Sequence, residues 1–417
     1  MDALAFGYSL LFKAHESLNL IYDSEFKIAD IIMAVHFQLE EFQSRIGKAC
    51  QSLRDRQLDG ILLFAPESHY YLTGYDTFGF AMFQCMVVTA DGQVHLYTRL
   101  PDLRQAQQTS ILENSQIHIW GEKEGADPFA GLWGLIDSLG LKGTSLGIEK
   151  KTVGLTAFNY EQLLATKDSV TTLVESSDLV SLIRRIKSEK EIKYHRKAAA
   201  LSDDALDAAL TSTRAGAFEG DILADMQGAV FRGGGSYAGN EFIIGSGEGA
   251  LLCRYQSGPK TLDQQDQMTL EWSGAYHRYQ AAMMRTLIVG SANDGQRKMH
   301  AAAVEALEAC ENTIKPGQPM GDVFDAHARV FDSHGLNHAR MQACGYGMGA
   351  IFNPIWVDFP MFYEGNPLLM DVGNVFFLHM ILMDSDAGLG MCWGHSVLVT
   401  DSGVERLSRS PLDIVEL

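Results

Sequence analysis

Side chains that can move protons are interleaved with aromatic rings in the C-terminal part of the chain. Carboxylates, imidazoles and phenols are the groups that proteins use for general acid and base catalysis. Glu271 lies in an otherwise apolar run, where a buried charge is costly unless it is paired or used, so we expect it in a site. The full set is Glu271, His277, Arg278, Tyr279, Tyr346, Asp358, Tyr363, His379 and His395, together with Trp272, Trp356, Phe359, Phe362 and Trp393.

Two further arginines, Arg254 and Arg285, and the aromatic residues of this set indicate the kind of substrate. A guanidinium binds a carboxylate through two hydrogen bonds, and aromatic faces attract a cation. A small zwitterion would satisfy both kinds of group. The residues that we expect to bind substrate are Arg254, Arg285, Trp272, Trp356, Trp393, Tyr363, His277 and His395.

Each of these residues also has a structural explanation. Arg285 is equally well explained as an anchor of a hairpin through backbone carbonyls, and Trp272 is expected to face the interior. His277 lies at an expected hairpin tip, where a solvated side chain is the default, and His379 is also explained as a hydrogen-bonded core imidazole. The site hypothesis therefore depends on the cluster rather than on any single residue.

The elements that would position this set follow from hydrophobic periodicity. The first half alternates short apolar strands with helices, which indicates a small α/β domain. Long helical periodicity follows over residues 179–232, beginning with a capping-box pattern at Ser188. The remainder has strands, a pair of helices and further strands, an α+β layout in which helices cover a curved antiparallel sheet.

Three ordered motifs resemble the creatinase, prolidase and aminopeptidase P group. They are the LTGY stretch at Leu72–Tyr75, the KSEKEI stretch at Lys187–Ile192 and the hairpin TLEWSGAYHRYQAAMMRT at Thr269–Thr286. The resemblance implies an α/β N-terminal domain followed by an α+β pita-bread (creatinase/aminopeptidase-like) C-terminal domain. We expect an N-terminal extension at residues 1–32, the first domain at 33–183 and the pita-bread domain at 184–417.

The metal-binding positions of the peptidase members are altered in this sequence. In those members two Asp, one His and two Glu hold two metal ions. By resemblance, the positions fall on Glu271, Ala282, Tyr346, His379 and Gly394. Ala282 and Gly394 have no donor side chain, so we expect no metal and no other cofactor. A new mononuclear metal site formed by Glu271, His379 and His395 is an alternative, and the spacing of these three residues does not require it.

Without a metal, a protein group must act as the base. Tyr346, in the glycine-rich stretch, is the first candidate and Tyr279 the second, whereas Glu271 or His379 would activate water. Proton abstraction followed by loss of a leaving group resembles the dimethylsulfoniopropionate lyases of this superfamily, and a metal-independent lyase is the leading hypothesis. The alternatives are a metal-independent C–N hydrolase of the creatinase or ectoine hydrolase type, and a ligand-binding protein without catalysis.

Composition restricts the remaining function classes. The chain has 417 residues, a net charge of -19 and a sequence pI near 5.0, which disfavours binding to nucleic acid or to an anionic membrane surface. The six cysteines form no CxxC pair, which favours reduced thiols and a cytoplasmic location. The resemblance implies a homodimer, in which Phe78, Phe80, Phe83 and Arg99 would reach the pocket of the partner.

Overall fold

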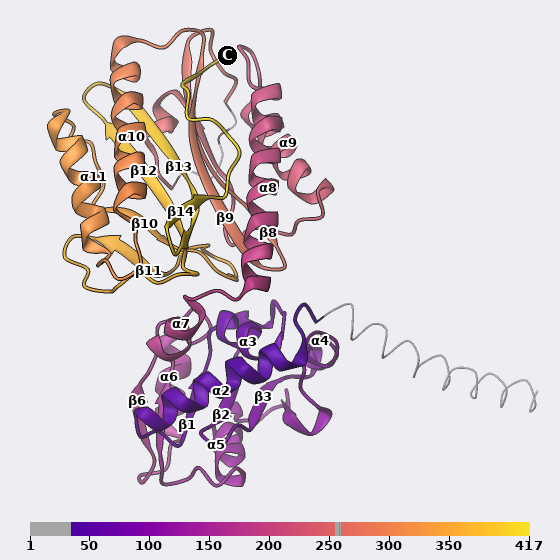
Figure 1. Ribbon diagram of the computed structural model, residues 1–417. Coiled ribbons are helices and arrows are strands. Elements are labelled where there is room, and N and C mark those ends of the chain that lie inside the picture. Colours follow the sequence, from indigo (N-terminus) through magenta and orange to yellow (C-terminus); the bar gives the residue numbers. More distant parts are fainter. Residues whose placement is uncertain (1–34, 255–257, 259) are drawn as a thin grey trace, which may run out of the picture. The chain divides into compact units, whose positions relative to one another are not determined.

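The computed structural model describes residues 35–254, 258 and 260–417, which form two compact units that divide between Val180 and Ser181 (Figure 1). The extension predicted at residues 1–32 lies outside the described residues. Helix α7 (Asp178–Arg184) carries the chain from the first unit into the second. The domain boundary predicted at residues 183 and 184 falls at the end of this helix.

The first unit is a mixed sheet flanked by helices, in the strand order β4-β3-β2-β1-β5-β6. Its strands are β1 (Gly60–Leu63), β2 (Cys85–Thr89), β3 (Val94–Arg99), β4 (Ile117–Trp120), β5 (Ser145–Ile148) and β6 (Thr172–Glu175). Its helices before α7 are α2 (Leu39–Asp55), α3 (Pro66–Thr73), α4 (Leu103–Thr109), α5 (Pro128–Ser138) and α6 (Ala157–Ala165). All four residues of β1 are buried, as the continuous apolar run Gly-Ile-Leu-Leu predicts.

The second unit is a nine-stranded sheet that carries helices on one face. The order is β11-β10-β12-β13-β9-β8-β7, and β14 pairs with β13 and β15 with β9. The strands are β7 (Ile243–Ser246), β8 (Asp266–Tyr276), β9 (Tyr279–Val289), β10 (Ala343–Gly347), β11 (Asp358–Tyr363), β12 (Val375–Asp384), β13 (Leu389–Thr400), β14 (Gly403–Arg406) and β15 (Val415–Glu416). The helices are α8 (Glu189–Ser212), α9 (Glu219–Arg232), α10 (Asp294–Thr313) and α11 (Gly321–Ser333).

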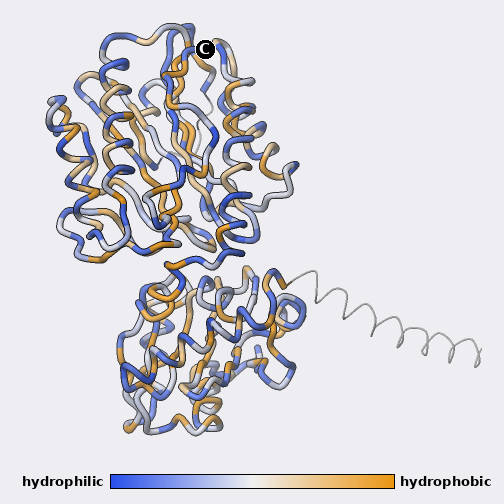
Figure 2. The backbone as a smooth tube through the Cα atoms, in the orientation of Figure 1, coloured by the Kyte–Doolittle hydropathy of each residue, from blue (hydrophilic) through white to orange (hydrophobic). Residues whose placement is uncertain are grey.

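The long helix α8 begins where the sequence predicts. The side chain of Ser188 accepts a hydrogen bond from the backbone N–H of Glu191, and the Glu191 side chain accepts one from the backbone N–H of Ser188, which completes a capping box. Helix α8 then packs on β8 and β9, and α10 packs on β12 and β13. Figure 2 shows hydrophobic and hydrophilic residues alternating along these helices, as expected for helices with one face against a sheet.

Close packing of α8 on the sheet depends on a residue without a side chain. A Cβ atom at Gly274 on β8 would collide with the carbonyl oxygen of Ala198 on α8. The Trp272 indole, on the same face of β8, donates a hydrogen bond to the Ser202 carbonyl oxygen at 2.9 Å. Alternate residues of β8, including Trp272 and Gly274, therefore point to the helices. The other residues of β8, including Glu271, point to the opposite face of the sheet, which we call the site face.

Candidate active site

Glu271 lies on the site face of β8, next to Met284 of β9, with which it is paired. Its side chain is partly buried, and the burial raises the pKa of the Glu271 carboxyl to about 7. The positive charge of Arg254 and a hydrogen bond from Tyr346 oppose this rise in pKa but do not cancel it. Glu271 can therefore both take up and release a proton near neutral pH.

Tyr346 of β10 reaches the same carboxylate. Its hydroxyl donates a hydrogen bond to Oε1 of Glu271 at 3.5 Å and accepts one from Nε1 of Trp356 at 2.9 Å. Burial and the neighbouring Glu271 charge raise the pKa of Tyr346 well above its usual value near 10. The phenol is thus neutral at physiological pH, and the buried Trp356 indole fixes its orientation.

His379 of β12 completes the cluster. Its ring centroid lies 5.5 Å from that of Tyr346, and its strand pairs it with Gly394 of β13. Burial lowers the pKa of His379 to about 4, so the imidazole is neutral at pH 7. Its Nδ1 atom is buried and has no hydrogen-bond partner among the described residues. His379 therefore carries an unsatisfied polar atom at its place beside Tyr346.

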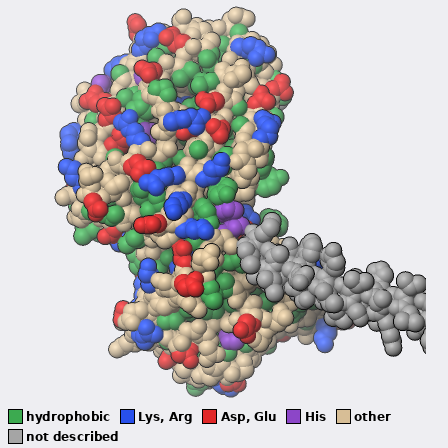
Figure 3. All heavy atoms as spheres, turned by 45° about the vertical axis from the view of Figure 1, so that its right-hand side comes forward, with side chains coloured by type: hydrophobic (Ala, Val, Ile, Leu, Met, Phe, Trp, Pro, Cys, Tyr) green, Lys and Arg blue, Asp and Glu red, His purple; other side chains and the backbone are tan. Residues whose placement is uncertain are grey.

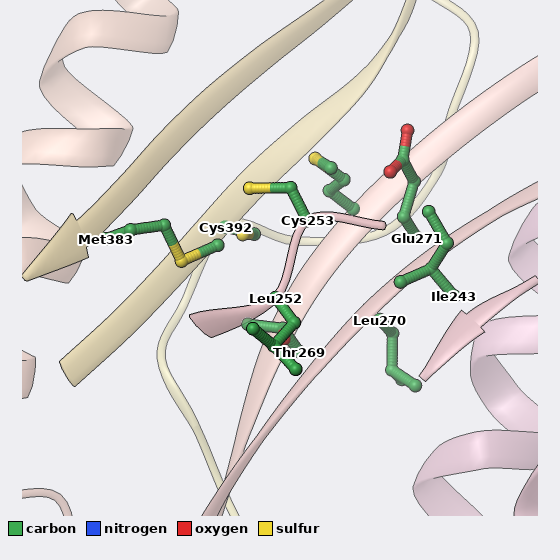
Figure 4. A pocket seen from close by; sticks show the side chains of 9 residues that line it. Ile243, Leu252, Cys253, Thr269, Leu270, Glu271, Met383 and Cys392 are labelled. Carbon is green, nitrogen blue, oxygen red and sulfur yellow. The ribbon is translucent and has the colours of Figure 1, made fainter. Parts of the chain in front are cut away.

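A hollow of about 240 Å³ opens beside Glu271, and the volume includes its mouth to solvent. It is lined by Ile243, Leu252, Cys253, Thr269, Leu270, Glu271, Met284, Met383 and Cys392. Figure 4 shows the Glu271 carboxylate at one end and the sulfur atoms of Cys253, Met383 and Cys392 toward the other. Burial raises the pKa of both thiols, so they are neutral at physiological pH. Among the described residues of the lining, Glu271 is the only one that ionises near neutral pH.

Arg254 is exposed and stands at the end of a segment that lines this hollow. The buried carboxylate of Glu219 accepts hydrogen bonds from the backbone N–H of Ser246 at 2.8 Å, the Ser246 hydroxyl at 2.5 Å and the backbone N–H of Gly258 at 3.1 Å. Ser246 and Gly258 flank the segment that contains Arg254. Glu219 therefore positions both ends of the segment that brings a positive charge toward Glu271.

The structure brings together Glu271, Tyr346, His379 and Trp356, with Arg254 close enough to influence the pKa of the first three. Sequence reasoning missed the residues that form the sulfur-rich wall. Met284 and Cys392 fall on the site face because they pair with Glu271 and with Ile381 of β12, respectively. The alternation of each strand, counted from Glu271 and His379, was the signal that could have found them.

Two of the predicted site residues belong to the packing of α8 instead. Trp272 follows Glu271 in β8 and points to the helix, where its indole hydrogen-bonds to Ser202. The hydroxyl of Tyr279 donates a hydrogen bond to Glu191 of α8 at 2.9 Å. The predictions that Tyr279 acts as a base and that Trp272 binds substrate are therefore wrong, because both side chains lie on the helix-covered face.

Three further predicted site residues lie under α10. Arg285 is buried and donates hydrogen bonds to the carbonyl oxygens of Met284 and Gly394, and its guanidinium carbon lies 5.0 Å from the centroid of the Trp393 ring. His395 is hydrogen-bonded to Glu311 of α10 at 2.7 Å. The substrate-binding roles predicted for Arg285, Trp393 and His395 are wrong. The alternative of Arg285 as a backbone anchor is confirmed, and a metal site of Glu271, His379 and His395 is excluded because His395 faces the other way.

The last two predicted substrate-binding residues lie at the margin of the sheet. His277 occupies the tight turn between β8 and β9 with a φ of 49°, and its ring packs against Tyr194 and Tyr276. Tyr363 is exposed at the end of β11. The structure does not place either residue beside Glu271. The role of His277 is that of a turn residue, and Tyr363 lies on the site face but beyond the cluster.

A strongly curved antiparallel sheet with helices on one face and an ionisable cluster on the other is the pita-bread arrangement of creatinase- and prolidase-type enzymes. Residues 193–401 match the model of metallopeptidase family M24, and residues 45–186 match the creatinase/prolidase N-terminal domain. The chain belongs to the M24 family. The fold predicted from the sequence is thereby confirmed.

Named relatives cover nearly the whole chain. An uncharacterized hydrolase/peptidase of Sinorhizobium fredii is 25% identical over 90% of this chain and 96% of its own length. The ectoine hydrolase of Halomonas elongata is 24% identical over 91% of this chain and 98% of its own length. The solved structure of a prolidase from Thermococcus sibiricus has a TM-score of 0.81 at 19% identity and covers 90% of this chain and 99% of that one. The chain thus falls among enzymes that are named hydrolases and peptidases.

The side chains present do not fit the metal that the family name implies. The five positions carried over by resemblance share the site face, since Met284 pairs with both Glu271 and Gly394, and Gly394 pairs with His379. Two of the five, Ala282 and Gly394, offer no donor atom. Within the part of the chain that the structure describes, no group of three or more His, Cys, Asp or Glu side chains is arranged to hold a metal ion.

Gly394 is also sterically restricted. A Cβ atom there would collide with the carbonyl oxygen of Leu378 on β12 and would press against the Cα of His379. A simple side-chain change at this position therefore cannot supply the missing donor.

Two observations concern the remaining predictions. Among the described residues, no helix has the length and apolar character needed to cross a membrane. On the side of the molecule drawn in Figure 3, acidic and basic side chains are both present, and several Lys and Arg side chains lie together on the lower part of the second unit. The predictions of a cytoplasmic location, a homodimer and a lack of nucleic-acid partners stay predictions.

Proposed function

We propose that this protein hydrolyses a C–N bond in a small polar compound, with Glu271 as the general base that activates water. The observation that carries the proposal is the pKa of about 7 for Glu271, a carboxyl at the wall of a small hollow. A base with a pKa near the working pH combines adequate ionisation with adequate basicity. The hydrolase names of the relatives support the same reaction class.

In the proposed reaction, Glu271 carries the one proton that moves from water to the leaving nitrogen. The ionised carboxylate takes a proton from water, and the hydroxide that forms attacks the electrophilic carbon of the C–N bond. The protonated Glu271 then gives its proton to the leaving nitrogen, and the C–N bond breaks. In this scheme the neutral Tyr346 hydroxyl and the neutral His379 imidazole contact the reacting group, and Arg254 supplies positive charge.

We also propose that the reaction needs no protein-bound metal, because two of the five ligand positions lack donors. The name of the ectoine hydrolase relative supports a cyclic amidine as one substrate to test, and creatine is a second. The small volume of the hollow supports a compact reacting group.

The lyase hypothesis fits the structure less well than hydrolysis. A tyrosine base must lose its proton, but burial and Glu271 raise the pKa of Tyr346 well above 10. The indoles of Trp272 and Trp393, which were expected to bind the cationic part of a zwitterion, point to the helices. Dimethylsulfoniopropionate remains a useful test compound because lysis yields an olefinic acid and hydrolysis does not.

The decisive experiment incubates chelator-treated protein with ectoine, creatine, an Xaa-Pro dipeptide and dimethylsulfoniopropionate, and identifies the products by mass spectrometry. We expect a hydrolysis product from a C–N substrate, its loss in Glu271→Gln and its retention in Glu248→Gln, which removes an exposed carboxylate. Acrylate from dimethylsulfoniopropionate with no C–N hydrolysis would overturn the proposal. Activity that returns only with added metal would overturn the metal-independent mechanism.

A further inference from the structure

A row of large apolar side chains is exposed along strand β11. Phe359, Met361 and Tyr363 are 40%, 39% and 46% exposed, and they alternate with the buried residues Asp358, Pro360 and Phe362. We call these three exposed side chains the β11 row. An outer strand of a sheet normally carries charged or otherwise protective residues on its open side. Three adjacent apolar side chains at such a place indicate a binding surface.

The register of the sheet places this row on the site face. Met361 of β11 is paired directly with Tyr346 of β10. Side chains that are directly opposite in an antiparallel pair lie on the same face of the sheet. The β11 row therefore begins beside the phenol that is hydrogen-bonded to Glu271, and it continues outward from that point.

The strand that carries the row is held firmly. The buried carboxylate of Asp358, at its start, forms an ion pair with the partly buried Arg184 at 2.8 Å. Phe362 packs edge-on against Phe376 of β12, with the ring centroids 4.7 Å apart. The exposed side chains thus stand on a fixed backbone, which lowers the entropy that binding would cost.

We propose that the β11 row binds an apolar group of the substrate while the C–N bond lies at Glu271. This inference rests on the proposed function and names a substrate class for it. The hollow beside Glu271 is small, since its volume of about 240 Å³ includes space that is open to solvent, so a hydrocarbon substituent of the substrate would extend beyond it. Arg254 is exposed and directly follows Leu252 and Cys253, which line the hollow, so its positive charge favours an anionic group near the reacting bond. The class is therefore a carboxylate-bearing amide or amidine with a hydrocarbon substituent.

The test uses N-acetylglycine, N-butanoylglycine and N-hexanoylglycine, which share an amide and a carboxylate and differ in chain length. We expect kcat/KM of the intact protein to rise by about two- to fourfold for each added methylene that reaches the row. The variant Met361→Ser should flatten this dependence. Phe158→Ser, which removes an exposed aromatic side chain from α6, is the matched control and should leave it unchanged.

Binding measured by calorimetry on Glu271→Gln separates this inference from the proposed function. Affinity that rises with chain length in Glu271→Gln, and not in the Glu271→Gln/Met361→Ser double variant, supports the row even if the parent protein hydrolyses none of the three. Hydrolysis whose chain-length dependence survives Met361→Ser overturns the row and leaves the proposed function standing. A change in oligomeric state by sedimentation, with no change in chain-length dependence, assigns the row to a protein contact and also overturns the inference.

Discussion

The hydroxyl of Tyr346 lies 3.5 Å from Oε1 of Glu271, although their strands are not neighbours. The path from β10 to β8 runs through β12, β13 and β9, so four strand spacings separate them. On a flat sheet this separation would be roughly 19 Å, since adjacent strands lie about 4.8 Å apart. The sheet must therefore curl strongly toward the site face. The cluster exists because of this curvature, and changes that flatten the sheet should abolish it.

The pH dependence of hydrolysis should follow the ionisation of Glu271. Because the base form is the carboxylate, kcat/KM should rise with pH through about 7 and level off above pH 8. A tyrosine base would place the rise above pH 10. The measurement is a pH–rate profile with a substrate that does not titrate in this range. A flat profile between pH 5.5 and 8 would contradict the role of Glu271.

The Glu271 carboxyl should also affect the free energy of unfolding. Its contribution should fall as the pH rises, whereas kcat/KM should increase. The folded state has a pKa of about 7, above the ordinary value of 4.5, so the folded protein favours the protonated carboxyl. Stability from this group is fully present below pH 4.5 and is lost as the pH rises through about 7. We expect Glu271→Gln to be more stable than the parent protein by up to roughly 3 kcal/mol at pH 8 and by much less at pH 5. Urea unfolding at the two pH values measures this difference, and Glu248→Gln should show none.

Trp356 should act through Tyr346. Its indole donates the hydrogen bond that orients the phenol, and Trp356→Phe removes that donor while it keeps an aromatic ring. We expect kcat to fall by about 2- to 10-fold, the usual worth of one hydrogen bond. In the Tyr346→Phe background the same substitution should have little further effect on kcat. Additive losses in this double-mutant cycle would show that Trp356 does not act through Tyr346.

Glu219 should position Arg254 rather than take part in the reaction. Glu219→Gln weakens the hydrogen bonds that tie Ser246 and Gly258 to one buried carboxylate. We expect a loss of about 1–3 kcal/mol of unfolding free energy and a rise in KM that exceeds the fall in kcat. In an Arg254→Ala background the effect on KM should largely disappear, whereas the stability loss should remain. A KM effect of the same size in both backgrounds would contradict this role.

Chelator treatment should leave the activity unchanged within about twofold, and added Zn²⁺, Mn²⁺ or Co²⁺ should not raise it. The reason is the donor set, since Ala282 and Gly394 cannot ligate a cation. Metal analysis of the purified protein should find well under one transition-metal ion per chain. Stoichiometric metal that is lost in Glu271→Gln would contradict this expectation.

The fold could be predicted because its signals are local and ordered along the chain. The capping box at Ser188 and the hairpin around Tyr276 and Tyr279 appear where their sequence patterns place them. Glu271 could be predicted as a site residue because a carboxylate in an apolar strand is costly unless it is paired or used. These inferences use only residue type and short spacing.

The membership of the site could be predicted only in part. Trp272 follows Glu271 directly, and His395 follows Gly394, yet both point to the helices because adjacent strand residues face opposite sides. A set of polar and aromatic residues that are close together in the sequence therefore includes side chains from both faces of the sheet. The contact of Tyr346 with Glu271 depends on sheet curvature, which no short pattern in the sequence encodes.

Gly394 makes it difficult to engineer a metal ligand onto the site face. Because the Leu378 carbonyl oxygen occupies the space that any side chain there would need, a carboxylate could be installed only after strands β12 and β13 had moved apart. Designing a metallopeptidase from this scaffold is thus a problem of remodelling the main chain, and a library of point substitutions at this position would be expected to return misfolded proteins before it returned a metalloenzyme.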